Sequence, residues 1–101
     1  MMDSKIFEII KDVVNSYLLE LDQVVVIESE VIYGNNKIEY ALSSDEYMAS
    51  ISILQNLTYD FFVLDIESET AIVSKTEQFK EIDELFCDLK VDIASFANFK
   101  K

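Results

Sequence analysis

The chain has 101 residues, half of them hydrophobic, and its twenty carboxylates outnumber its eight lysines to give a formal net charge of −12. This length is typical of a single domain, and such a high apolar content argues against intrinsic disorder. The sequence contains no histidine, arginine or proline, one glycine and one cysteine. It therefore excludes imidazole metal sites, thiolate zinc sites, glycine-rich phosphate loops and intramolecular disulfides.

The excess of carboxylates bears on partners and location. A field this negative repels nucleic acid and anionic membranes and attracts basic surfaces. The lone Cys87 indicates a reducing compartment, and its position beside an apolar stripe predicts that it fills the core. The N-terminal residues lack the apolar run of a signal peptide, and no stretch is long enough to span a membrane. We expect a soluble cytoplasmic protein, monomeric or weakly dimeric, without cofactor, metal, nucleic-acid partner or membrane partner.

The first element is predicted to be an amphipathic helix over about residues 4–21. Apolar residues recur there at helical spacing, and charged or polar residues occupy the opposite side. Asp3 or Ser4 is suited to cap its first turn. The stripe expected to be buried consists of Ile6, Ile9, Ile10, Val13, Tyr17, Leu18 and Leu21.

A hairpin is predicted next. Residues 24–33 are dense in β-branched side chains, and because they do not alternate cleanly we expect a bulge in this strand. Gly34, Asn35 and Asn36 tolerate positive φ and predict the turn into an alternating strand over residues 37–43.

Residues 47–74 show the alternation of a β-meander, interrupted at 55–58 and again at 67–69. One face of its first strand is expected to carry Tyr47, Ala49, Ile51 and Ile53. The next strand is apolar on both faces, and the face assigned to the core carries Phe62, Leu64 and Ile66. The other face, expected to point away from the helices, carries Tyr59, Phe61 and Val63.

Helical periodicity returns at about residue 78. The apolar stripe of this last helix consists of Ile82, Leu85, Phe86, Leu89, Ile93 and Phe96. The side opposite the stripe carries Glu81, Asp83, Glu84, Asp88 and Asp92. Val91 lies off the stripe, so the pattern is also compatible with a kink or break near Lys90.

Two amphipathic helices need a common apolar surface, and laying both on one face of the sheet supplies it. We predict one domain over residues 1–101 with an α+β fold of order αββββ(β)α. It is a two-layer sandwich in which an antiparallel sheet of four to five strands leaves its other face open. The predicted inner layer includes Ile9, Ile10, Val13, Tyr17, Leu64, Ile66, Leu85, Phe86 and Leu89.

The carboxylates are unevenly placed along the chain. From residue 12 to residue 74 there are twelve acidic residues and one lysine, Lys37, so the negative field belongs to the sheet and its loops. Exposed aromatic residues bordered by carboxylates are typical of a protein interface. The predicted binding surface consists of Glu28, Glu30, Glu39, Asp60, Phe61, Asp65 and Glu67. The competing location, on the outer side of the last helix, consists of Glu81, Glu84, Asp88 and Asp92.

Catalysis is not expected. No histidine is present to activate a serine or cysteine, and twenty carboxylates form close pairs by chance, so such a pair would be weak support for a glycosidase. The acidic run over residues 65–69 admits three interpretations. It is an acidic loop presented to a basic partner, a loose cation site, or a solvated turn that keeps the sheet from pairing with other chains.

Three motifs in order, YMASISILQ, YDFFVLDIESE and QFKEIDELFCDL, cover a little under half of the chain. With the order of helix, strands and helix, they resemble the small acidic immunity proteins of bacterial polymorphic toxin systems, in particular the TriTu type. The positions that carry the resemblance are Tyr47, Ala49, Asp65, Ile66, Glu67, Phe79, Glu81 and Leu85. The sequence differs from that type at Ser68 and Glu69, where a glycine-containing turn is expected, and in having no tryptophan.

The resemblance implies a protein that binds and neutralises a cognate toxin domain, by covering its active site or an essential surface. A nuclease or nucleotide-consuming toxin has a basic cleft, to which an acidic inhibitor is complementary. The alternative function is an acidic DNA mimic or anti-defence inhibitor, in which carboxylates stand in for phosphates. A small structural subunit of a larger assembly is a third interpretation.

Overall fold

The computed structural model describes residues 5–21 and 25–99 of the chain. Its elements are α1 (Lys5–Leu19), β1 (Val26–Tyr33), β2 (Lys37–Ser43), β3 (Tyr47–Leu54), β4 (Thr58–Asp65), β5 (Thr70–Gln78) and α2 (Ile82–Ala97). The predicted order of helix, antiparallel strands and helix is confirmed, with five strands. The expected caps at Asp3 and Ser4, and the start of the first strand at Val24, lie outside the described residues.

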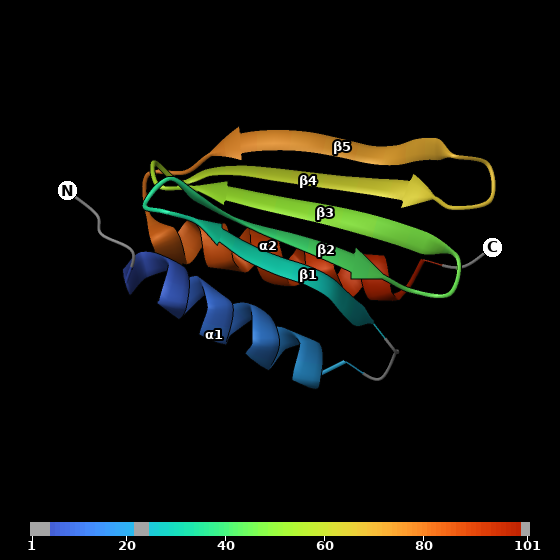
Figure 1. The fold of residues 1–101 in the computed structure, drawn as a ribbon, viewed down its shortest axis with the longest axis horizontal. Helices are drawn as coiled ribbons and strands as arrows, with labels where there is room; N and C mark the ends of the chain where they lie inside the picture. Colours follow the sequence, from blue (N-terminus) through green and yellow to red (C-terminus); the bar gives the residue numbers. More distant parts are fainter. Residues whose placement is uncertain (1–4, 22–24, 100–101) are drawn as a thin grey trace.

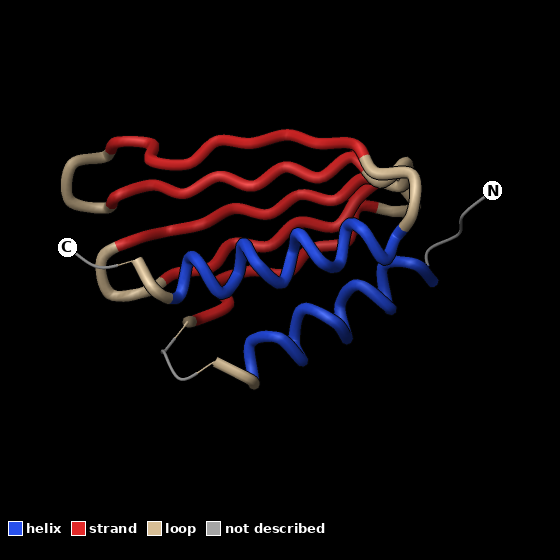
Figure 2. Tube along the Cα trace, turned by 180° about the vertical axis from the view of Figure 1, so that it is seen from behind, coloured by secondary structure: helices blue, strands red, loops and turns tan. Residues whose placement is uncertain are grey.

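The five strands form one antiparallel sheet in the order β1-β2-β3-β4-β5. Both helices pack on the same face of it, with α2 behind the sheet in Figure 1 and in front of it in Figure 2. The structure is therefore the predicted two-layer α+β sandwich. The expected bulge is present in β1 between Ile27 and Ser29, and Gly34 has a φ of 56° in the turn that follows β1.

The face of β4 that packs on the helices is the one predicted to point away from them. Phe61 is 2% exposed and Tyr59 and Val63 are fully buried, whereas Phe62 is 39% and Ile66 43% exposed. The cause is the register with β3, which pairs Ile53 with Tyr59, Ile51 with Phe61 and Ala49 with Val63. Cross-strand partners lie on the same face. The four residues of β3 predicted to share a face are indeed buried, so their partners in β4 are buried too.

The helices differ from the predictions in detail. In α1 the fully buried residues are Phe7, Ile10 and Val14, and Ile9 is 53% exposed, so the buried stripe is rotated from the one predicted. Val13 and Tyr17 pack at the border of the core.

Helix α2 buries Leu85, Leu89, Ile93 and Phe96 as expected and continues without a break past Lys90. Phe86 packs at the border of the core. Cys87 is exposed rather than buried, because it lies two residues beyond Leu85 and so on the opposite side of the helix.

Adjacent phenylalanines of β4 give a direct test of this arrangement. Phe61→Ala should lower the free energy of unfolding by about 3–5 kcal/mol, because it leaves a cavity in the core. Phe62→Ala should cost no more than about 1.5 kcal/mol, because that ring is partly in water already. Urea unfolding at neutral pH measures both. Equal losses in the two variants, or the reverse ranking, would contradict the observed orientation of β4.

Candidate functional site

The face of the sheet turned away from the helices, here called the open face, carries an exposed aromatic ring at its centre. Cross-strand pairing places Ser50 and Ser74 on either side of Phe62. These side chains are too short to cover the ring, which explains its 39% exposure. Met48, which is 40% exposed, and Leu64 form the next pair along the sheet. The open face therefore offers a small apolar patch within a polar surrounding.

Two of the predicted carboxylates lie on this face. Glu39 and Asp60 belong to one cross-strand row, separated by Ser52. The Glu39 carboxylate pairs with the Lys37 ammonium at 3.2 Å, and Asp60 accepts a hydrogen bond from the Thr76 hydroxyl. Glu39 and Asp60 thus lie in one row of the open face, two strands apart, beside the apolar patch.

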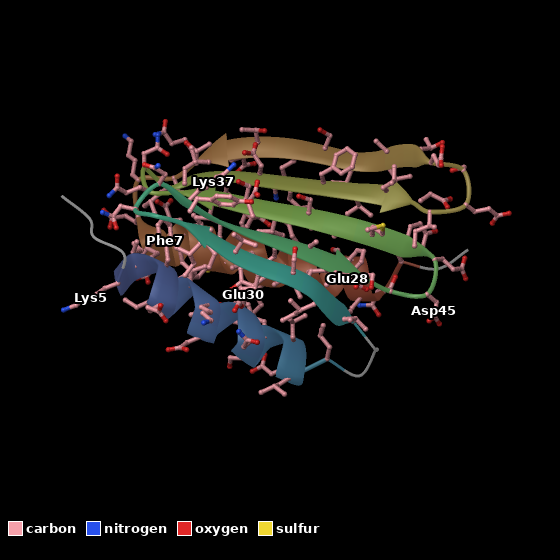
Figure 3. The ribbon with its side chains drawn as sticks, viewed as in Figure 1. Lys5, Phe7, Glu28, Glu30, Lys37 and Asp45 are labelled. Carbon is pink, nitrogen blue, oxygen red and sulfur yellow. The ribbon has the colours of Figure 1, made fainter. Side chains whose placement is uncertain are left out.

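The bulge in β1 separates the other two predicted strand carboxylates. Glu28 is the bulged residue; its carboxylate is exposed and accepts a hydrogen bond from the Ser43 hydroxyl at 2.5 Å. After the bulge, Glu30 points towards α1, where Lys11 lies 3.6 Å and the Asn15 amide 3.4 Å from its carboxylate oxygens. Figure 3 shows Glu30 between β1 and α1. Glu28 remains accessible, but Glu30 is not on the open face, and its inclusion in the predicted surface is wrong.

Phe61 is also wrongly included in that surface. Its ring is stacked near Tyr59 in the core, with ring centres 6.5 Å apart. On β4, the aromatic residue presented to the open face is its neighbour Phe62; Tyr33, which pairs with Lys37, is also exposed on that face. The length of the turn between β3 and β4 could have predicted which face of β4 is buried. A short turn over residues 55–57 places Tyr59 opposite Ile53, and cross-strand partners share a face.

Two turns gather carboxylates at one end of the sheet, here called the acidic tip. The backbone N–H of Ile66 donates to the Glu46 carbonyl at 3.0 Å and ties the β4–β5 turn to the β2–β3 turn. The N–H of Glu67 donates to the Asp65 carboxylate at 3.0 Å. The acidic tip comprises Asp45, Glu46, Asp65, Glu67 and Glu69. The sequence prediction included Asp65 and Glu67 but missed the contribution of the β2–β3 turn, although alternate turns of a meander always meet at one end.

Glu69 holds a left-handed backbone, with φ 57°, at the position where a glycine was expected. Such a conformation is unfavourable for a residue with a side chain. Beside it, Ile66 is 43% exposed. The tip therefore combines carboxylates with one exposed aliphatic side chain.

On the helix side, four polar side chains join α2 to β4 and β5. The Tyr59 hydroxyl donates to Asp92 at 2.7 Å, and the Lys75 ammonium lies 2.7 Å from Asp92 and 3.1 Å from Asp88. Asp92, predicted to be on the outer side of the last helix, is instead only 9% exposed. We call this group the helix–sheet clamp.

The clamp alters the acid–base properties of its members. Burial, with the hydrogen bond to Asp92, raises the pKa of Tyr59. Burial alone lowers the pKa of Lys75, but its bonds to Asp92 and Asp88 outweigh this effect and raise that pKa overall. Lys75 therefore stays charged, and the group acts as a structural contact.

Tyr40 provides a contrast to Tyr59. Its ring is 1% exposed, and its hydroxyl is the one buried side-chain polar atom in the described ranges without a hydrogen bond of normal geometry. Burial raises the pKa of Tyr40, and the neighbouring Glu30 raises it further.

Two further features of the described chain bear on metal binding and proton transfer. No three Asp, Glu or Cys residues among 5–21 and 25–99 converge closely enough to hold a metal ion. An open hollow at the end opposite the acidic tip is lined by Asn36, Leu54, Gln55 and Asn56, none of which can exchange a proton. Within the described residues, no helix is long and apolar enough to cross a membrane.

Comparison with known proteins gives no relative: no family model, curated protein or solved structure matches this chain.

The clamp predicts how stability depends on pH. Tyrosine ordinarily ionises near pH 10.0 and lysine near 10.5, but the folded chain holds these protons to higher pH. Above about pH 10 the unfolded state therefore releases protons that the folded state keeps, and stability falls. Urea unfolding should show this stabilisation intact at pH 8 and declining between pH 10 and 11, and Tyr40, whose pKa is also raised by burial, should contribute to the decline. Tyr59→Phe should lower the free energy of unfolding at pH 8 by about 1–2 kcal/mol.

Tyr40→Phe is the matched control. It removes a buried hydroxyl whose contact with Glu30 is not a hydrogen bond of normal geometry, so the loss in free energy of unfolding at pH 8 should be smaller than that for Tyr59→Phe. A loss for Tyr40→Phe as large as that for Tyr59→Phe would contradict the difference in hydrogen bonding.

Proposed function

We propose that this chain is an immunity protein that binds a cognate bacterial toxin domain and neutralises it by covering a basic active-site cleft. The observation that carries the proposal is the meeting of exposed apolar side chains with carboxylates on the open face and the acidic tip. Buried aromatic and aliphatic anchors supply binding energy at interfaces, and charges bring the partners together quickly and in register. The sequence motifs that resemble TriTu-type immunity proteins support the same function.

The positions of the lysines support a negatively charged sheet side. Lys11, Lys75 and Lys90 pair with carboxylates on the helix side of the molecule. Lys37 is the one lysine that the described strands place on the open face, and it lies at the end away from the acidic tip. The helix side thus contains internal compensation for its carboxylates through these three lysines.

This arrangement favours a protein partner over the imitation of DNA. A phosphate-mimicking surface needs carboxylates in a continuous track. On the open face, Glu39 and Asp60 are separated by Ser52, and the neighbouring row is centred on Phe62. An exposed aromatic ring in that position suits an apolar pocket on a protein.

Charge reversal at two sites tests the proposal. The proposal predicts a toxin gene directly upstream of the gene for this chain, and the probe is the inactivated toxin domain of that gene product. Asp45→Lys combined with Glu67→Lys should weaken binding at least tenfold, because two attractive contacts become repulsive. Phe62→Ala, which leaves the charge unchanged, should also weaken binding at least tenfold through loss of an anchor. Isothermal titration calorimetry gives Kd for each variant.

The matched control is Glu81→Lys combined with Glu84→Lys, which makes the same change in net charge at the exposed N-terminal end of α2. Its Kd should stay within about threefold of the wild type. Tight binding by the tip variant together with loss in the α2 variant would place the contact on the helix. Absence of any binding by the wild-type chain would refute the proposed function.

A further inference from the structure

The two edges of the sheet are protected to different degrees. At the β1 edge the strand is bulged, and α1 lies beside it, with Lys11 and Asn15 contacting Glu30. The β5 edge lies at the opposite margin of the sheet, away from α1 (Figures 1 and 2). An uncovered edge strand presents backbone groups that can pair with another chain.

The hydrogen-bond pattern identifies which backbone groups face outwards from β5. The N–H of Phe79 donates to the Leu57 carbonyl at 3.0 Å, next to the pair Thr58 and Gln78. Hydrogen-bonded pairs alternate along an antiparallel ladder. The residues of β5 that bond to β4 are therefore Val73, Lys75 and Glu77. Those that point their N–H and C=O groups outwards are Ser74, Thr76 and Gln78.

The bond between Ile66 N–H and Glu46 C=O leads independently to the same assignment. Together with the β3–β4 register, this bond shows that the backbone groups of Phe62 and Leu64 form hydrogen bonds with β3. Alternate residues of a central strand bond to opposite neighbours, so Phe61 and Val63 bond to β5. Three outward donors and three outward acceptors thus line roughly 14 Å of edge from residue 74 to residue 78.

Proline and a bulge, two devices that commonly block an edge strand, are missing from this half of β5. The irregularity of this strand lies opposite Val63 and Leu64. Its one lysine, Lys75, is drawn to the helix side by the clamp. The outward residues Ser74 and Thr76 have short neutral side chains on the open face, which leave room for a neighbouring strand.

We infer that the β5 edge from Val73 to Gln78 receives an extended strand of the basic toxin partner, which continues the sheet as a sixth strand. This inference rests on the proposed function and specifies how the partner is held. Side chains of the added strand lie next to Ser74 and Thr76, with Phe62 and Asp60 beyond them. Lysine or arginine on that strand meets Asp60 on one face and Glu77 on the other. A second copy of this chain is disfavoured at the β5 edge, because its own net charge of −12 would be repelled by the charge of the first copy.

Proline at an outward-facing position tests the inference. Ser74→Pro removes an N–H that β4 does not use, so the variant should fold, because proline is tolerated on a free edge. Its Kd for the inactivated toxin domain should rise at least tenfold, and that of Thr76→Pro likewise. Ser74→Ala, which keeps the N–H, should stay within about twofold. In the wild-type chain, amide hydrogen exchange at residues 74, 76 and 78 should slow at least tenfold in the complex.

The outcomes separate this inference from the function on which it rests. If the toxin domain binds the wild type but the proline variants bind equally well, or the three amides exchange as before, the inference is wrong and the proposed function stands. If the wild type does not bind the toxin domain, both are wrong. Light scattering that shows a wild-type dimer converted to a monomer by Ser74→Pro would assign the edge to a second copy and overturn the inference.

Discussion

The rest of the structure depends on the alternation of side chains along β4. A strand has only two faces, and once its register with β3 places Tyr59, Phe61 and Val63 against the helices, every intervening residue is directed outwards. The same constraint therefore builds the core and produces the open face. Phe62 is exposed because of where Phe61 must lie, and its serine neighbours keep it accessible. A one-residue shift of this register would exchange the two sets.

The helix–sheet clamp connects the core to the outer edge. A buried carboxylate is tolerated only when it is paired and hydrogen-bonded, and Asp92 meets both needs through Lys75 and Tyr59. The clamp fixes α2 beneath β4 and β5 and at the same time removes the one lysine of β5 from the free edge. Packing on the helix side thus leaves Phe62 and the outer edge of β5 uncovered, the surfaces that we propose meet a basic partner.

The sequence was sufficient for the element order, the bulge in β1 and the common face of β3, because long periodic runs and a Gly-Asn-Asn turn are strong local signals. It was insufficient for β4, because both of its faces are apolar and only the pairing partner distinguishes them. Asp92 was misplaced because its burial depends on Tyr59 and Lys75, partners from β4 and β5 that the sequence of the helix does not indicate. Glu30 was misplaced because the bulge at Glu28 turns the residues that follow it to the opposite face of the sheet from the one expected. The roles of Asp65, Glu67, Asp60, Glu39 and Glu28 as toxin contacts remain predictions.

We propose that carboxylates of the sheet side attract a basic toxin domain. The association rate constant of this chain with its proposed toxin partner, measured by stopped-flow fluorescence from low to high ionic strength, tests this attraction. We predict a fall of at least tenfold between about 0.05 M and 0.5 M salt, with a much smaller change in the dissociation rate, because screening removes long-range attraction. An association rate that is independent of salt, or that rises with it, would show that long-range charge attraction does not guide binding.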